Sequence, residues 1–294
     1  MSCTSPSISR RKTMTKEERK SLQAAAARIR MRVIEGTHAA KSGHPGGSLS
    51  CSDFLAYLYL REMNVNPAEP RWADRDRFVL SKGHCAPALY GALVERGFFP
   101  EEEILTLRRI GSRLQGHPNM NLTPGVDMST GSLGQGVSTA CGMALGARKL
   151  GKSLRVYTLL GDGEIEEGQV WEAAMMAAHY GLDNLCMVVD NNNLQIDGAI
   201  SDVMSPYPIT EKFAAFGFFV QEIDGHDFDQ IEAALTAARA EKGRPSVIVL
   251  KTVKGKGVSF MENQVGWHGT APNDEQYEQA MSELRAALAE VEAE

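Results

Sequence analysis

Two short polar segments, each directly after an apolar run, carry the residues best suited to binding a metal ion. They are GDGEIEEG (161–168) and DNNNLQIDG (190–198). Asp162 and Asn192 offer hard oxygen ligands, and Mg²⁺ in proteins usually takes one or two carboxylates together with phosphate oxygens. Either segment alone is typical of an ordinary Asp/Asn turn. Because both follow predicted strands, the pair favours a site for Mg²⁺ and a diphosphate.

A second group of chemically suited residues is a set of histidines in Gly- or Pro-rich segments. Of the seven histidines, four lie in such segments: His44 in SGHPGG, His84 in SKGHC, His117 in QGHPN and His268 in GWHGT. Imidazole exchanges a proton near neutral pH, so this set predicts a site of acid–base chemistry. No pair has the helical spacing typical of a zinc site. The remaining histidines receive no catalytic role: His38, His179 and His226.

Residues 146–153, GARKLGKS, match the P-loop pattern of nucleotide hydrolases, which is a competing interpretation. A working P-loop follows a strand and opens a helix, so that the helix amides meet the phosphates. Here the helical pattern of Ser132–Leu150 comes first and the apolar run Leu154–Leu160 comes after it. Gly151 is then expected to end the helix, and the match is coincidental.

The elements that must position these residues alternate between apolar runs and helical patterns, which favours a parallel sheet flanked by helices, an α/β fold. The runs lack polar alternation, as expected for strands buried on both faces: Arg77–Ser81, Leu154–Leu160, Leu185–Asp190, Phe218–Ile223 and Ser246–Lys251. The helical patterns are Lys16–Ala40, Cys51–Glu62, Ser132–Leu150, Gln169–Tyr180, Phe228–Ala240 and Asp274–Glu290. Ligands bind beyond the carboxyl ends of such strands, where both polar segments fall. We expect one domain over 16–294, after a disordered basic tail over 1–15.

Composition narrows the possible partners. The 294 residues include 31 Lys and Arg against 37 Asp and Glu, a net charge of -6, which gives no electrostatic case for binding nucleic acid. No window of about 18 uncharged apolar residues predicts a membrane span. The five cysteines are far apart and predict neither a disulfide framework nor a zinc site. The start of the chain lacks an apolar signal core, so the cytoplasm is the expected compartment.

The motifs together resemble the N-terminal, diphosphate-binding part of the transketolase family, over about residues 16–269. The motifs that carry the resemblance are SGHPGG (42–47), SKGHCAPALY (81–90), GHPN (116–119), TGSLGQG (130–136), GDG (161–163) and DNNNLQIDG (190–198). The resemblance implies a thiamine-diphosphate-binding α/β domain of the PP type. It also implies a divalent cation, Mg²⁺ or a substitute such as Ca²⁺ or Mn²⁺.

The resemblance also implies a role for each matching residue. Magnesium ligands would be the side chains of Asp162 and Asn192 and the carbonyl of Leu194. His84, Gly163 and His268 would contact the diphosphate, and Gly131 and Leu133 would lie against the cofactor rings. The substrate hydroxyls would be surrounded by His44, His84, His117 and His268. Glu167 would reach across a subunit interface, or complement the dipole of the helix that follows it.

Full-length transketolases continue into a pyrimidine-binding domain and a C-terminal domain, which supply the activating glutamate and the arginines that hold the sugar phosphate. The resemblance therefore implies one half of a split transketolase, which self-associates as two plus two and is completed by a C-terminal subunit. It would move a two-carbon ketol unit from a ketose phosphate to an aldose phosphate. The alternatives are dihydroxyacetone synthase, deoxyxylulose-phosphate synthase, a sugar-specialised ketol transferase, and a non-catalytic cofactor-binding subunit.

Two features stay open at this point. KGKG (254–257) follows the run Ser246–Lys251, and is either a basic loop at the ligand end of the sheet or a turn with solvated lysines. Cys85 directly follows His84, but nothing in the sequence indicates a lowered thiol pKa, so it receives no role.

Overall fold

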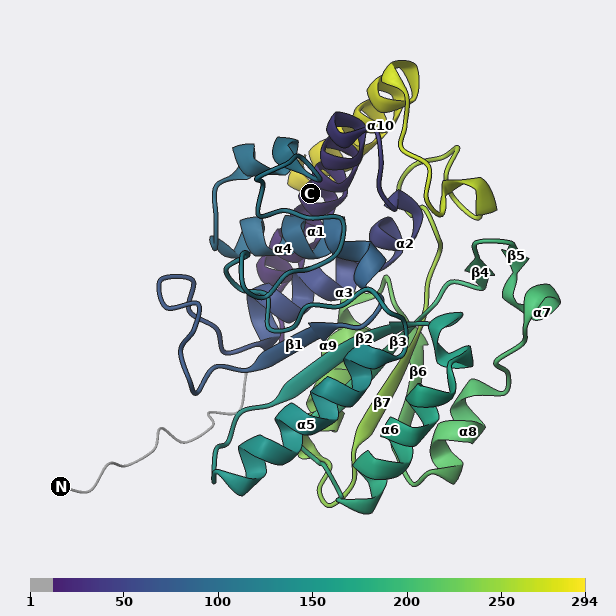
Figure 1. Ribbon diagram of the computed structural model, residues 1–294. Helices are drawn as coiled ribbons and strands as arrows, with labels where there is room; N and C mark the ends of the chain where they lie inside the picture. Colours follow the sequence, from purple (N-terminus) through teal and green to yellow (C-terminus); the bar gives the residue numbers. More distant parts are fainter. Residues whose placement is uncertain (1–12, 294) are drawn as a thin grey trace.

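A five-stranded parallel sheet lies at the centre of the computed structural model, in which residues 13–293 are described (Figure 1). The strands, in spatial order, are β1 (Arg77–Leu80), β2 (Val156–Gly161), β3 (Leu185–Asn191), β7 (Ser246–Lys251) and β6 (Phe219–Asp224). A short antiparallel pair, β4 (Leu194–Gln195) and β5 (Gly198–Ala199), lies outside this sheet. The predicted α/β class and all five predicted strands are confirmed, with boundaries that differ by two residues at most.

Helices cover both faces of the sheet. Their bounds are α1 (Lys16–Ala40), α2 (Pro45–Ser50), α3 (Ser52–Tyr57), α4 (Ala86–Arg96), α5 (Gln135–Lys149), α6 (Gly168–His179), α7 (Ile200–Val203), α8 (Ile209–Ala215), α9 (Phe228–Ala240) and α10 (Asp274–Ala293). Figure 1 shows α5, α6 and α8 in front of the sheet, α9 behind it, and α1, α4 and α10 stacked above. Along β2, Tyr157 and Leu159 join one apolar core while Val156 and Leu160 join the other. Burial on both faces explains why the strand runs are continuously apolar.

Two parts of the sequence prediction need correction. Helix α4, inside the motif SKGHCAPALY, and the shorter helices α2, α7 and α8 were not predicted. For α4, Pro87 in its first turn and Gly97 after its end, at φ +90°, are typical helix boundaries. Most of the predicted basic tail lies outside the described residues. Its last part is packed, however, because Met14 is buried and its N–H donates to Glu232 Oε2 at 3.0 Å.

The register of the sheet brings the polar segments together. Gly161 pairs with Asp190, and Asn191 pairs with Lys251, so β2, β3 and β7 end side by side. The segments that follow these strands therefore share one edge, as parallel topology requires. The segment that matched a P-loop lies at the opposite end, between the end of α5 and the start of β2, which confirms that the match is coincidental. Among the described residues, no helix is long and apolar enough to cross a membrane.

Candidate active site

The four histidines of the Gly- and Pro-rich segments form one cluster at the carboxyl edge of the sheet. The ring centroid of His44 lies 5.3 Å from that of His84, 6.3 Å from His117 and 5.6 Å from His268. His84 and His268 are stacked, with centroids 5.2 Å apart. His44 precedes α2, His84 lies in a 3₁₀ turn after β1, and the other two come from separate loops. His44 and His268, which are 224 positions apart in the sequence, thus face the same small volume.

The environment keeps most of this cluster neutral at neutral pH. Burial, followed by the charge of His84, lowers the pKa of His44 to about 4. Burial, followed by the charge of Lys254, lowers the pKa of His268 to about 3. The pKa of His117 is lowered by burial and by Arg108. The Nδ1 atom of His44 is buried without a hydrogen-bond partner among the described residues, so it is free to meet a ligand.

These lowered pKa values predict a loss of stability in mild acid. Below about pH 6.5, the ordinary histidine pKa, unfolded His44 and His268 take up protons that the folded protein rejects. The free energy of unfolding should therefore fall as the pH drops from about 6.5 towards 4, and be fully retained above that window. Urea unfolding of the cofactor-free protein at pH 7.5 and pH 5 measures this. In a His44→Asn/His268→Asn variant the decrease should be smaller, and an equal decrease would contradict the prediction.

Asp162, the predicted metal-binding carboxylate, is buried directly after β2. Its Oδ1 accepts the N–H of Gly163 at 2.9 Å, and its Oδ2 accepts the N–H of Asn193 at 2.6 Å and the side-chain amide of Asn191 at 3.1 Å. It forms no ion pair with any described residue. Burial and the charge of Asp190 raise the pKa of Asp162 to about 6, against these hydrogen bonds. A buried carboxylate without a basic partner suits a cation as its ligand.

The other two predicted metal ligands already take part in hydrogen bonds. Asn192 Oδ1 accepts the N–H of Leu194 at 3.2 Å, and Asn192 Nδ2 donates to Asp190 at 3.2 Å. The carbonyl of Leu194 accepts from Lys254 Nζ at 2.9 Å. No group of three or more His, Cys, Asp or Glu among the described residues could hold a metal ion. A cation here would therefore depend on one carboxylate, amide and carbonyl oxygens, and a ligand that brings its own anionic oxygens.

Lys254 is a site residue whose role the sequence leaves open. The side chain is 1% exposed, and its Nζ contacts both the Leu194 carbonyl and His268 Nδ1, the latter at 2.9 Å. Burial and the charge of Lys82 lower its pKa to about 8. Of the two interpretations of KGKG, the basic loop at the ligand end is correct for Lys254. This lysine links the histidine cluster to the Asp162 side of the site.

A second buried lysine, Lys82, was not predicted from the sequence. It forms an ion pair with the fully buried Asp190 and donates to the carbonyl of Gly47 at 3.1 Å. Asp190 also accepts from the hydroxyls of Ser50, at 2.6 Å, and Thr252. Burial opposes the charge on Lys82, but its neighbours, Asp190 first among them, together outweigh burial and raise the lysine pKa well above its usual value. The network ties the ends of β1, β3 and β7 together beneath the site.

The segment TGSLGQG is held against the histidines by a buried glutamate. Glu164 accepts from the N–H groups of Gly134 at 2.9 Å and Gly161 at 3.0 Å, and from the Ser81 hydroxyl. Gly131 has φ +149° and lies so close to the ring of His117 that a Cβ would come within 3.0 Å of it. Only glycine fits this position. Leu133 is 36% exposed on the same segment.

Two further charged residues have contrasting positions. Glu167 is exposed at the N-cap of α6, where its side chain makes no capping hydrogen bond, so it is free to complement the helix dipole or meet another chain. Arg108, which no sequence motif marks, has φ +59° and a buried Nε without a partner among the described residues. Its Nη1 donates to Ser42 Oγ at 3.2 Å.

The residues without an assigned role have structural explanations. His226 bridges Asp53, at 2.7 Å, and the N–H of Val253, at 3.0 Å, and His38 pairs with Asp274. The four cysteines within the described part of the chain are buried and free.

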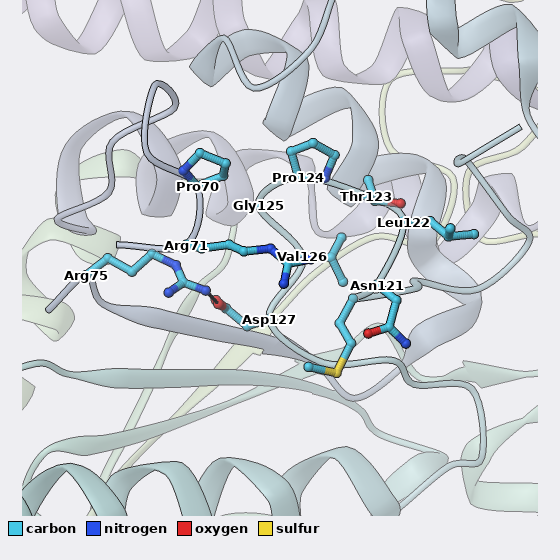
Figure 2. A pocket seen from close by; sticks show the side chains of 11 residues that line it. Pro70, Arg71, Arg75, Asn121, Leu122, Thr123, Pro124, Gly125, Val126 and Asp127 are labelled. Carbon is cyan, nitrogen blue, oxygen red and sulfur yellow. Dashed lines mark hydrogen bonds and ion pairs between the residues drawn. The ribbon is translucent and has the colours of Figure 1, made fainter. Parts of the chain in front are cut away.

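A hollow of about 160 Å³ lies apart from the site and is lined mainly by residues 120–127 with Arg71 and Arg75 (Figure 2). None of the predicted site residues lines it.

Fold and site together define an α/β domain in which buried Asp162, Lys82 and Lys254 lie beside a cluster of four histidines at the carboxyl edge of the sheet. Residues 21–288 match the family model for the transketolase thiamine diphosphate binding domain. The chain is 46% identical over 268 residues to the 6-deoxy-6-sulfo-D-fructose transketolase subunit SqwG of Clostridium sp. strain MSTE9, covering 91% of this chain and 98% of that protein. The chain belongs to the transketolase family, through its thiamine-diphosphate-binding domain.

Two other comparisons show which part of the family the chain matches. One of the apulose-4-phosphate transketolase subunits of Phocaeicola vulgatus is 41% identical over 273 residues, which cover 93% of this chain and 97% of that protein. The crystal structure of transketolase from Campylobacter jejuni superposes with a TM-score of 0.85 at 31% identity. That match covers 92% of this chain but 45% of the Campylobacter chain. The chain thus spans nearly all of the two separate subunits and less than half of the longer transketolase.

Proposed function

We propose that this chain is the cofactor-binding subunit of a two-polypeptide transketolase, which transfers a two-carbon ketol unit from a ketose phosphate to an aldose phosphate. The observation that carries the proposal is the contact of Lys254 with both His268 and Leu194. This contact joins a cluster of neutral histidines to the edge that carries Asp162. The groups that would exchange protons and those that would hold a diphosphate and a metal ion are therefore neighbours. Similarity to two separate subunits over nearly their whole length supports the split arrangement.

The residues present fit thiamine diphosphate and a divalent cation, Mg²⁺ or a substitute such as Ca²⁺ or Mn²⁺. Asp162 and Asn192, through their side chains, and Leu194, through its carbonyl, would hold the cation. The Leu194 carbonyl already accepts a cationic group, the ammonium of Lys254, and Asp162 is a buried carboxylate with no ion pair among the described residues. The diphosphate would be contacted by His84, Gly163, His268 and Lys254, and the cofactor rings by Gly131 and Leu133. When bound, thiamine diphosphate supplies the nucleophilic carbon that this chemistry requires.

The histidines supply the proton transfers. His44 and His268 would take the proton of the donor hydroxyl next to the bond that breaks, and return it when the acceptor adds. Both are neutral at neutral pH, so each keeps a ring nitrogen that can accept a proton, and a bound anionic diphosphate would raise their lowered pKa values towards the working range. His84 and His117 would hold the terminal hydroxyl of the two-carbon unit. The four imidazole rings to which these roles are assigned lie next to one another in the cluster.

In a two-polypeptide transketolase, other chains would complete the site. A C-terminal subunit with the pyrimidine-binding domain would supply the activating glutamate and the sugar-phosphate arginines. Glu167, exposed at the start of α6, would reach across the interface in an assembly of two plus two chains. A sugar-specialised ketol transferase is favoured, because two similar subunits are named for 6-deoxy-6-sulfo-D-fructose and apulose 4-phosphate.

The test is ketol transfer from xylulose 5-phosphate to ribose 5-phosphate with thiamine diphosphate and Mg²⁺. The chain is assayed alone and with the polypeptide that co-purifies from its native cell. We expect turnover only in the complex, because the proposed partner supplies the activating glutamate. Turnover by the isolated chain would contradict the split arrangement. If both are inactive but bind cofactor, 6-deoxy-6-sulfo-D-fructose and apulose 4-phosphate are the next donors, and failure with every donor would favour a non-catalytic cofactor-binding subunit.

A further inference from the structure

Tyr207 is a half-exposed side chain whose hydroxyl contacts the end of β3. It lies between α7 and α8 and is 42% exposed. Its hydroxyl lies 2.9 Å from Asn191 Nδ2, 3.0 Å from Asn191 Oδ1, and within hydrogen-bond distance of Asn193 Oδ1. A phenol has one proton to donate and can accept another. The consistent arrangement is that it accepts from Asn191 Nδ2 and donates to Asn193 Oδ1, the nearer amide oxygen.

The two asparagines that Tyr207 contacts both donate to a single oxygen atom. Asn191 Nδ2 reaches Asp162 Oδ2 at 3.1 Å with its second hydrogen, and the backbone N–H of Asn193 reaches the same oxygen at 2.6 Å. Asn193 is in the left-handed region, at φ +64°, which asparagine adopts more readily than most residues, and its side-chain oxygen accepts from the Tyr207 hydroxyl. The Tyr207 hydroxyl therefore holds both donors that direct Asp162 Oδ2.

We propose that Tyr207 is a positioning residue for the divalent cation, because its hydroxyl fixes the two asparagines that orient the Asp162 carboxylate. The inference rests on the proposed function, in which Asp162 binds that cation. Groups that hold a metal ligand in place typically contribute about 10- to 100-fold to metal affinity. Neither a metal-binding motif nor burial marks Tyr207, so only its contacts identify it.

The test is Tyr207→Phe, which removes one hydroxyl and keeps the ring. The complex with the partner subunit is titrated with Mg²⁺ at saturating thiamine diphosphate, and bound cofactor is followed by near-ultraviolet circular dichroism. We expect the Mg²⁺ midpoint to rise about 10- to 100-fold while the signal at saturating Mg²⁺ is retained. The matched control is Tyr180→Phe, since Tyr180 is 48% exposed at the end of α6 and contacts neither asparagine in the described structure.

A second variant separates positioning from a general effect on folding. Asn193→Gly tolerates the left-handed backbone and keeps the N–H to Asp162, but removes the amide oxygen that accepts from Tyr207. It should shift the Mg²⁺ midpoint in the same direction, with an unchanged melting temperature in the absence of metal. If the unaltered complex binds cofactor in a Mg²⁺-dependent way and both variants match it, the inference is wrong and the proposed function stands. If the unaltered complex shows no Mg²⁺ dependence, both are overturned.

Discussion

Replacing Asp162 with alanine is expected to abolish Mg²⁺-dependent binding of thiamine diphosphate, a larger effect than any other single change at the metal site. Asp162 is the one acidic side chain that the proposed cation site uses, since Asn192 and Leu194 contribute uncharged oxygens. The loss should exceed the roughly 100-fold effect expected for a group that only orients a ligand. Calorimetric titration of the complex with thiamine diphosphate, with and without Mg²⁺, measures it.

The matched variant is Asp162→Asn, which keeps the shape of the side chain and an oxygen that accepts the N–H groups of Gly163 or Asn193. It should also lose Mg²⁺-dependent binding, because the negative charge is gone. Without metal, two effects on its stability oppose each other. The charge that burial and Asp190 disfavour is gone, but the amide nitrogen faces an N–H donor that a carboxylate oxygen accepted, so its melting temperature serves as the folding control. Retained Mg²⁺-dependent binding in both folded variants would remove Asp162 from the cation site.

The sheet could be predicted from the sequence because strands buried on both faces leave continuous apolar runs. Helices α1, α5, α6, α9 and α10 were predicted from their 3.6-residue pattern. Helix α4 was missed because its motif was singled out for His84 and not for an apolar pattern. Its buried side, including Leu89 and Leu93, lies in a helix that contacts α1 and α3. The apolar pattern of a helix does not say which other helix or sheet packs against its apolar side.

The site could be predicted where its residues lie in distinctive short motifs, as Asp162, Asn192 and the four histidines do. Lys254 was ambiguous because a lysine in a short segment such as KGKG is ordinary in a solvated turn, and only tertiary packing buries it. Tyr207 and Arg108 were missed for a related reason. Their contacts join segments distant in sequence, and a tyrosine before a proline, or an arginine in a basic stretch, is common at surfaces.

Replacing His44 or His268 with alanine is expected to lower turnover of the complex by about 10²–10⁴-fold, the usual contribution of one positioned acid–base group. Both imidazoles are held neutral by burial, and each lies within 5.6 Å of at least one other ring of the cluster. The two variants should differ in a second property. His268 contacts Lys254, so His268→Ala should also weaken cofactor binding, whereas His44→Ala should leave it unchanged.

Steady-state kinetics at saturating cofactor separates these effects, because turnover then reports the chemistry and a cofactor titration reports binding. His179→Ala is the matched control, since His179 lies at the end of α6, outside the cluster, and should leave turnover unaltered. Unchanged turnover in both His44→Ala and His268→Ala would place proton transfer elsewhere. The partner subunit would then have to supply the base, and the histidine cluster would serve only to hold the sugar hydroxyls, which a raised KM for the donor would reveal.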